Sequence, residues 1–145
     1  WPERAAASIS THDLPTAAGF LRGEHVRVRA ELGLLGEDTA EAAEWARARA
    51  GRAELIGLLR TEGLLPESDE ASERDIVVAM HALLARTPCR LLLASPYDAV
   101  GELRQPNLPG TIDEYPNWRL PLPVTLEELQ HDPRVRQVID ALRRR

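Results

Sequence analysis

The segment of this chain best suited to chemistry is residues 107–119, which read NLPGTIDEYPNWR. The segment follows neither the helical nor the strand period, and its proline, glycine and asparagine are typical of a loop that holds a fixed shape. The rings of Tyr115 and Trp118 can stack on a sugar, and the amide of Asn107 can donate to and accept from hydroxyls. The loop therefore favours carbohydrate binding, with a purely structural proline turn as the alternative.

Titratable side chains follow two short apolar runs. His12 and Asp13 come at the end of residues 5–11, and Asp98 lies just beyond residues 90–95. Both runs are predicted to be strands, and the second reads as a parallel strand buried on both faces. Active sites of parallel barrels lie at the carboxyl ends of the strands, so we expect both groups of side chains to face the same rim.

Each of these side chains also has a structural interpretation. Asp13 stands before Leu-Pro-Thr and is a good N-cap for a following helix, while Asp98 can equally cap residues 99–103. His12 can be a partly buried histidine with satisfied hydrogen bonds. Trp118 can anchor the loop in the core instead of serving as a sugar platform. Position alone favours the N-cap for Asp13 and leaves Asp98 open, and the core anchor is the favoured interpretation of Trp118.

Helices are predicted for most of the remaining chain. Apolar spacing and turn residues place them at residues 14–23, 26–35, 40–62, 73–85, 126–130 and 133–144, with Pro15 in the first turn of the first helix. N-caps are expected from Asp38 or Thr39, from Ser72 with Asp75, and from Thr125 and Asp132. The apolar side of the long helix is expected at Ala43, Ala46, Ala50, Ala53, Ile56 and Leu59.

The order of elements is strand, helices, strand, loop and helices. Two buried strands of this kind need parallel neighbours, and this chain supplies at most one pairing. The sequence therefore predicts an α/β fold that is part of a larger α/β protein, helix-rich and with few short parallel strands.

Composition excludes several classes of function. The chain has 145 residues, which fits one domain, and its net charge of −5 argues against a nucleic-acid partner. The single Cys89 excludes an internal disulfide framework and fits a reducing cytoplasm. No apolar run reaches membrane-spanning length, and we expect no membrane partner, metal or cofactor. The arginines at positions 143–145 are expected to complement a helix C-terminus.

Three motifs carry a resemblance to a known family. They are THDLPT at residues 11–16, NLPGT at residues 107–111 and YPNWR at residues 115–119. Together, in this order and at this separation, they resemble the 4-alpha-glucanotransferases, also called amylomaltases or disproportionating enzymes. The resemblance runs over nearly the whole chain. The family fold is a (β/α)8 barrel of the TIM type with inserted helical subdomains.

The resemblance implies that residues 1–145 are the C-terminal portion of such a catalytic barrel. Residues 9–13 correspond to strand seven and residues 90–95 to strand eight, each with the helices that follow it. Family enzymes are several times longer, and this chain opens at Trp1 without an initiator methionine. We therefore expect a fragment whose partner is the rest of its own catalytic domain.

The resemblance also implies roles for individual residues. Asp13 matches a third carboxylate that stabilises the transition state, and His12 matches its neighbouring sugar-binding histidine. Asn107 borders the sugar groove, and Asp98 is a further candidate for substrate binding. The expected substrates are alpha-1,4-glucans and maltooligosaccharides, which are transferred to a new 4-position acceptor by a retaining mechanism.

The nucleophile and the acid/base of the family lie on earlier barrel strands, and nothing in this chain matches their motifs. The isolated chain is therefore expected to be inactive. One alternative is a non-catalytic glucan-binding or interaction module that keeps the loop. A weaker one is a hydrolase on the same barrel.

Overall fold

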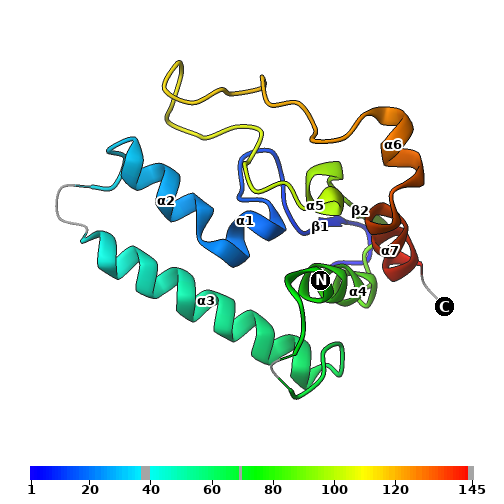
Figure 1. Ribbon diagram of the computed structural model, residues 1–145. Helices are drawn as coiled ribbons and strands as arrows, with labels where there is room; N and C mark the ends of the chain where they lie inside the picture. The colour runs from blue at the N-terminus through cyan, green and yellow to red at the C-terminus, as the bar shows by residue number, and fades with distance from the viewer. Residues whose placement is uncertain (37–39, 69, 144–145) are drawn as a thin grey trace.

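The chain forms a helix-rich α/β structure with two short parallel strands (Figure 1). The computed structural model describes residues 1–36, 40–68 and 70–143. Along these residues the elements are β1 (Ala6–Ser8), α1 (Ala17–Arg22), α2 (Glu24–Glu31), α3 (Glu41–Thr61), α4 (Glu73–Ala85), β2 (Leu91–Leu93), α5 (Pro96–Val100), α6 (Leu126–His131) and α7 (Pro133–Leu142). A long loop joins α5 to α6 and passes beside α2 (Figure 1).

The two strands pair in parallel, as the sequence predicts. Each has only three residues and is shorter than the run from which it was predicted, residues 5–11 or 90–95. Residues 9–13, which the resemblance matched to strand seven, are not a strand here, because the pairing with β2 ends at Ser8. The carboxyl ends of both strands lie at the same edge, so the segments that leave them start side by side. The register joins Ala6 to Leu91, Ala7 to Leu92 and Ser8 to Leu93.

The prediction that residues 90–95 are buried on both faces is wrong for this chain. Leu91 is 62% exposed and Leu93 is 53% exposed, whereas Leu92 packs with Ala7 and Cys89. Side chains alternate between the two faces of a strand. Within the described residues, packing covers the face of Leu92 and leaves the opposite face apolar and open.

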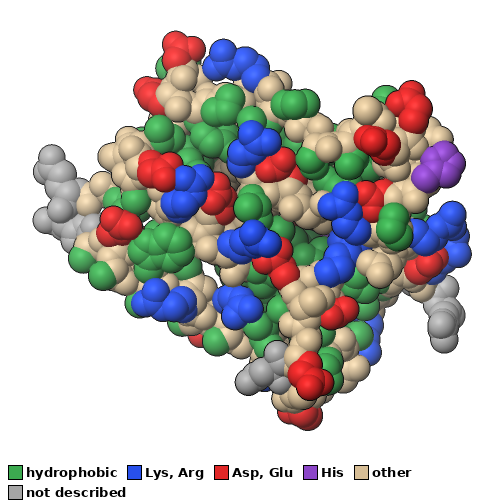
Figure 2. Space-filling model, in the orientation of Figure 1, with side chains coloured by type: hydrophobic (Ala, Val, Ile, Leu, Met, Phe, Trp, Pro, Cys, Tyr) green, Lys and Arg blue, Asp and Glu red, His purple; other side chains and the backbone are tan. Residues whose placement is uncertain are grey.

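Charged side chains of both signs are interspersed on the face shown in Figure 2. Some form ion pairs along a helix, as Arg27 does with Glu24 and Glu31 of α2. Others join elements, as Arg22 of α1 does with Glu73 of α4 at 2.7 Å. This mixed surface differs from the basic face that phosphate binding requires.

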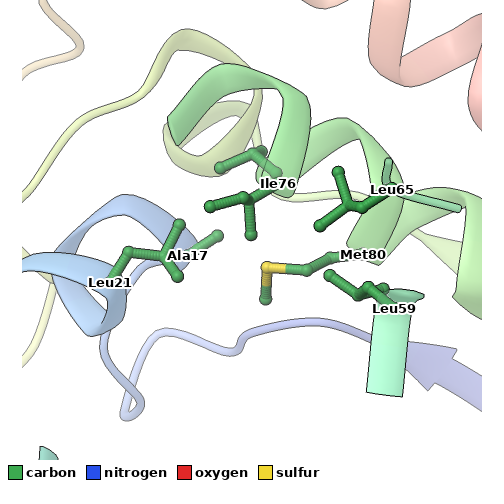
Figure 3. Packing of buried hydrophobic residues seen from close by; sticks show 8 residues of the cluster. Ala17, Leu21, Leu59, Leu65, Ile76 and Met80 are labelled. Atoms are coloured by element: carbon green, nitrogen blue, oxygen red, sulfur yellow. The ribbon is translucent and has the colours of Figure 1, made fainter. Parts of the chain in front are cut away.

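The largest hydrophobic cluster joins α1, α3 and α4 (Figure 3). Ala17 and Leu21 come from α1, and Ile76 and Met80 from α4. Leu59 of α3 belongs to the same cluster and is fully buried. Burying a side chain of this size stabilises the fold by about 1.5–3 kcal/mol, so this cluster is the main support for the elements that lead to the site.

The buried side of α3 differs in part from the predicted one. The alanines expected to be buried are exposed: Ala43, Ala46, Ala50 and Ala53. The prediction is confirmed for Leu59, which is fully buried, and for Ile56, which packs against the same cluster. In the first half of the helix Ala48 and Gly51 face inward instead, and the ring of Trp45 covers Gly23, where a Cβ would lie 2.4 Å from a ring carbon. Alanine barely distinguishes a buried face from an exposed one, so the larger side chains decided the orientation.

Most predicted N-caps are confirmed. Ser72 and Asp75 form a full capping box at the start of α4, Thr125 caps α6, and the Asp132 side chain accepts from the Arg134 backbone N–H at the start of α7. The predicted caps Asp38 and Thr39 lie outside the described residues, as do the last two arginines. These caps are local, because donor and acceptor lie within three residues of each other.

The start of α1 corrects one prediction. The helix begins at Ala17, so Pro15 lies before it and not in its first turn. The hydroxyl of Thr16 accepts the capping hydrogen bond from the Gly19 backbone N–H at 3.0 Å. Asp13 is therefore not the N-cap. Two further bounds differ: α2 covers Glu24–Glu31 and not residues 26–35, and α7 ends at Leu142 and not at residue 144. The short helix α5 was not among the predicted helices.

Candidate functional site

The segment between β1 and α1 meets the start of the long loop, and this contact builds a polar site. The Asn107 backbone N–H donates to the carbonyl of His12 at 3.1 Å. The Nδ2 of Asn107 donates to Oδ1 of Asp13 at 2.6 Å across 94 positions of sequence. Nε2 of His12 lies 3.2 Å from Oδ2 of Asp13. Three of the predicted site residues are thus brought together.

The carboxylate at the centre of this group is open to solvent. The side chain of Asp13 is 47% exposed and that of His12 is 54% exposed, while Asn107 is half-buried. The amide and the imidazole fix the direction of the carboxylate without covering it. A carboxylate held in this way can accept hydrogen bonds from the hydroxyls of a bound sugar.

Trp118 lies beside His12 and points out of the protein. Its side chain is 66% exposed, and the two ring centroids are 4.9 Å apart with a 44° tilt. Its backbone has a φ of 60°, and its N–H donates to the carbonyl of Pro106. A non-glycine residue in this region of φ costs conformational energy. Because the indole is exposed, the interpretation of Trp118 as a core anchor is wrong.

Tyr115 is the aromatic residue that anchors the loop. It is 6% exposed and packs with Leu108 and Leu120 against the end of α2. Its hydroxyl donates to the carbonyl of Gln105 at 2.8 Å. Burial raises the pKa of this phenol, although Arg104 opposes the shift. Tyr115 is thus a buried support and not a sugar platform.

Asn117 fixes the turn at residues 108–111, a role that sequence reasoning missed. Its Oδ1 accepts from the Leu108 backbone N–H at 2.8 Å, and its Nδ2 donates to Oγ1 of Thr111 at 2.8 Å. Gly110 lies in the same turn with a φ of +88°. Asparagine side chains commonly bond nearby backbone in turns, so an asparagine next to Pro116 was the available signal.

A cavity of about 240 Å³ adjoins the polar group. His12 and Trp118 line one part of it, and residues 95–97 line another. The hydroxyl of Tyr97 donates to the carbonyl of Leu120 at 3.0 Å, which joins this part of α5 to the loop. The lining is mainly apolar, with hydroxyls from serine and threonine, and this combination suits a sugar ring, whose faces are apolar and whose edges carry hydroxyls.

Asp98 does not lie at this surface. It is 1% exposed, and both carboxylate oxygens accept internal hydrogen bonds, from Oγ of Ser10 at 2.5 Å and from the Ala17 backbone N–H at 2.7 Å. It also lies inside α5 and does not cap residues 99–103. The expectation of direct substrate binding by Asp98 therefore does not fit its position, because the short helix α5 turns this side chain toward α1.

Comparison with known proteins identifies the family of this chain. A sequence model described as 4-alpha-glucanotransferase matches residues 1–126 of the chain. The chain belongs to the 4-alpha-glucanotransferase family. Among curated 4-alpha-glucanotransferases, that of Mycobacterium tuberculosis is 44% identical over 149 aligned positions, which cover 99% of this chain and 20% of the relative. That of Haemophilus influenzae is 27% identical over 124 positions, which cover 81% of this chain and 18% of the relative.

A solved structure from the same family agrees. The crystal structure of amylomaltase from Corynebacterium glutamicum aligns with a TM-score of 0.87 and 33% identity, over 97% of this chain and 22% of that chain. The chain therefore spans about a fifth of the length of the curated relatives that it matches.

No group of three or more histidine, cysteine or carboxylate side chains in residues 1–36, 40–68 and 70–143 is arranged to hold a metal ion. Within the same part of the chain, no helix combines the length and apolar character needed to cross a membrane.

Proposed function

We propose that the protein to which this chain belongs is a 4-alpha-glucanotransferase. It transfers a segment of a 1,4-alpha-glucan to a new 4-position acceptor and retains the anomeric configuration. Its substrates are alpha-1,4-glucans and maltooligosaccharides. The observation that carries the proposal is the meeting of His12, Asp13 and Asn107 beside a cavity, in a chain of this family.

The mechanism assigns Asp13 to transition-state stabilisation. Retaining transfer uses a nucleophilic carboxylate and an acid/base about 5–5.5 Å apart, and Asp13 is neither of them in this proposal. Its exposed carboxylate accepts hydrogen bonds from ring hydroxyls. These bonds strengthen as the sugar flattens toward an oxocarbenium ion and contribute several kcal/mol. The contacts with His12 and Asn107 hold the carboxylate in place before the sugar arrives.

His12, Asn107 and Trp118 bind the sugar around this carboxylate. His12 has an exposed imidazole between Asp13 and the cavity, where it can bond a hydroxyl. Asn107 acts partly through Asp13, since its Nδ2 donates to that carboxylate. Trp118 offers an exposed indole at the cavity for stacking on a pyranose ring.

The chain is proposed to be the C-terminal portion of a (β/α)8 barrel, with β1 in place of residues 9–13 as strand seven and β2 as part of strand eight. The parallel register supports this placement, and so does the open apolar face of Leu91 and Leu93, which further barrel elements would cover. The rest of the catalytic domain then supplies the nucleophile and the acid/base. A cytoplasmic location is consistent with the single Cys89, a buried residue.

The test is an assay of the full-length protein on maltotriose. We expect glucose together with oligosaccharides longer than maltotriose, the products of disproportionation. The 145-residue chain alone should leave maltotriose unchanged, because it lacks the covalent chemistry. Glucose and maltose without longer products would indicate a hydrolase. Binding of glucan by the full-length protein with no product at all would indicate the non-catalytic module.

A further inference from the structure

One buried carboxylate holds both ends of the segment that carries His12 and Asp13. The acceptor is Asp98 of α5, which is 1% exposed. Its Oδ2 accepts from Oγ of Ser10, two residues before His12. Its Oδ1 accepts from the backbone N–H of Ala17, the first residue of α1. The residues between these two anchors carry the site.

Further hydrogen bonds attach the same segment to the chain that follows α5. Oγ1 of Thr16 donates to the carbonyl of Glu102 at 2.6 Å. The backbone N–H of Asn107 donates to the carbonyl of His12 at 3.1 Å. All these partners come after β2, whereas the segment comes after β1. The position of the site therefore depends on how α5 and the following turn are fixed against the first strand.

The choice of a carboxylate at this position calls for an explanation. Burying a charged group is unfavourable for folding unless its partners compensate. Both hydrogen-bond partners of Asp98 are neutral donors, a hydroxyl and a backbone amide, and its charge also interacts with the buried His81. A carboxylate has two acceptor oxygens and can hold two separate donors at once. We therefore expect the main role of Asp98 to be fixing the positions of Ser10 and Ala17, and not increasing the stability of the fold.

We propose that Asp98 is a positioning residue for Asp13. By fixing Ser10 and Ala17 it sets where the His12-Asp13 pair stands against Asn107. This inference rests on the proposed function, because it concerns the rate of the same glucan transfer. Displacing a catalytic group by about 1 Å can lower a rate about a hundredfold. Loss of the anchor should therefore lower kcat more than it raises KM, since Asp13 acts in the transition state.

Two substitutions at this position separate positioning from direct action. Asp98→Asn keeps one oxygen for the Ala17 N–H, and its amide can donate to Ser10, because a hydroxyl both accepts and donates. Asp98→Ala removes both acceptors. A positioning role predicts that Asp98→Asn recovers most of the kcat lost in Asp98→Ala. A carboxylate that acted directly on the sugar would not be replaced by a neutral amide.

The experiment compares these variants in the full-length protein, with Ser10→Ala as a third. Thermal unfolding, kcat and KM on maltotriose are measured for each, with kcat expressed per folded molecule. We expect Asp98→Ala to lower kcat at least about tenfold with KM within about threefold. Asp98→Asn should stay within about threefold of wild type, and Ser10→Ala, which loses one anchor, should fall between the two. Leu59→Ala is the matched control, a core substitution on α3 outside the site.

The outcomes are distinct. Unchanged kcat per folded molecule in Asp98→Ala, as in Leu59→Ala, would overturn the proposal and leave Asp98 a purely structural residue. Equal losses in Asp98→Asn and Asp98→Ala would also overturn it, in favour of direct action. If Asp98→Ala does not fold, unchanged kcat in Ser10→Ala overturns the proposal and a reduced kcat supports it. Failure of the wild-type protein to disproportionate maltotriose would instead contradict the proposed function.

Discussion

The helical core and the rim of the site are held together by different interactions. The core of α1, α3 and α4 is apolar, and its central residues Leu59 and Ile76 are 0% and 2% exposed. The rim consists of residues 10–16 and 104–107 together with Trp118. There, partly exposed polar groups bond across long stretches of sequence, as Asn107 does with Asp13.

The difference separates stability from activity. An apolar core stabilises the fold in proportion to the area it buries, whatever its distance from the site. An exposed hydrogen-bonded rim adds little to stability, but it sets the direction of a few groups within fractions of an ångström. Substitutions in the two regions should therefore change different measurements. Asp98 lies where the regions meet, buried like the core and bonded like the rim.

The largest effect is expected from the core. Leu59→Ala in the full-length protein should lower the free energy of unfolding by about 2–5 kcal/mol, because it removes a fully buried side chain and leaves a cavity. Activity per folded molecule should stay the same. Thermal unfolding with kcat on maltotriose checks both expectations. A normal melting temperature, or a loss of kcat in the folded fraction, would contradict the expectation that the core affects stability and the rim affects activity.

The next effect is expected from the rim. Asp13→Asn should lower kcat at least about a hundredfold, which equals about 2.7 kcal/mol of transition-state stabilisation. The melting temperature should change little, since Thr16 and not Asp13 caps α1 and the side chain is 47% exposed. Asparagine can still accept the hydrogen bond from Asn107. Normal kcat in a folded Asp13→Asn protein would leave Asp13 without a catalytic role.

Elements with local signals could be predicted from the sequence. The capping box of Ser72 and Asp75 was readable because both partners lie within one turn. The α3 face was predicted correctly at Ile56 and Leu59 but not at the alanines, because alanine gives almost no hydrophobic contrast and the contact of Trp45 with Gly23 joins distant segments. α5 has only five residues, too few to leave a helical period. Its absence from the prediction is also why the burial of Asp98 was missed.

The sequence indicated which residues belong to the site better than it indicated how they contact one another. The motifs pointed to His12, Asp13 and Asn107, and these residues do meet. No sequence period can indicate a hydrogen bond across 94 positions, so the contact itself needed the fold. The two aromatics of the loop were interchangeable in sequence. Their opposite orientations depend on the backbone, with a φ of 60° at Trp118.

The smallest effect is expected at Trp118, where stability and activity should change in opposite directions. Its indole is 66% exposed on a backbone with positive φ, so Trp118→Gly should relieve strain by about 1 kcal/mol or more. The melting temperature should stay level or rise. The same change removes the ring that we propose stacks on the sugar, so kcat/KM on maltotriose should fall about five- to tenfold, or about 1–1.4 kcal/mol.

Two matched variants complete this test. Trp118→Phe keeps an aromatic ring and should keep most of kcat/KM. Tyr115→Phe removes the hydroxyl that donates to Gln105 and should lower stability by about 1 kcal/mol with kcat/KM unchanged per folded molecule. These results would show the same difference between two aromatics of one loop as between the core and the rim. Tyr115 would contribute to stability, and Trp118 would contribute to sugar binding. A lower melting temperature in Trp118→Gly with unchanged kcat/KM would reverse the assignment, because it would show that the strained backbone is held for packing and not for a substrate.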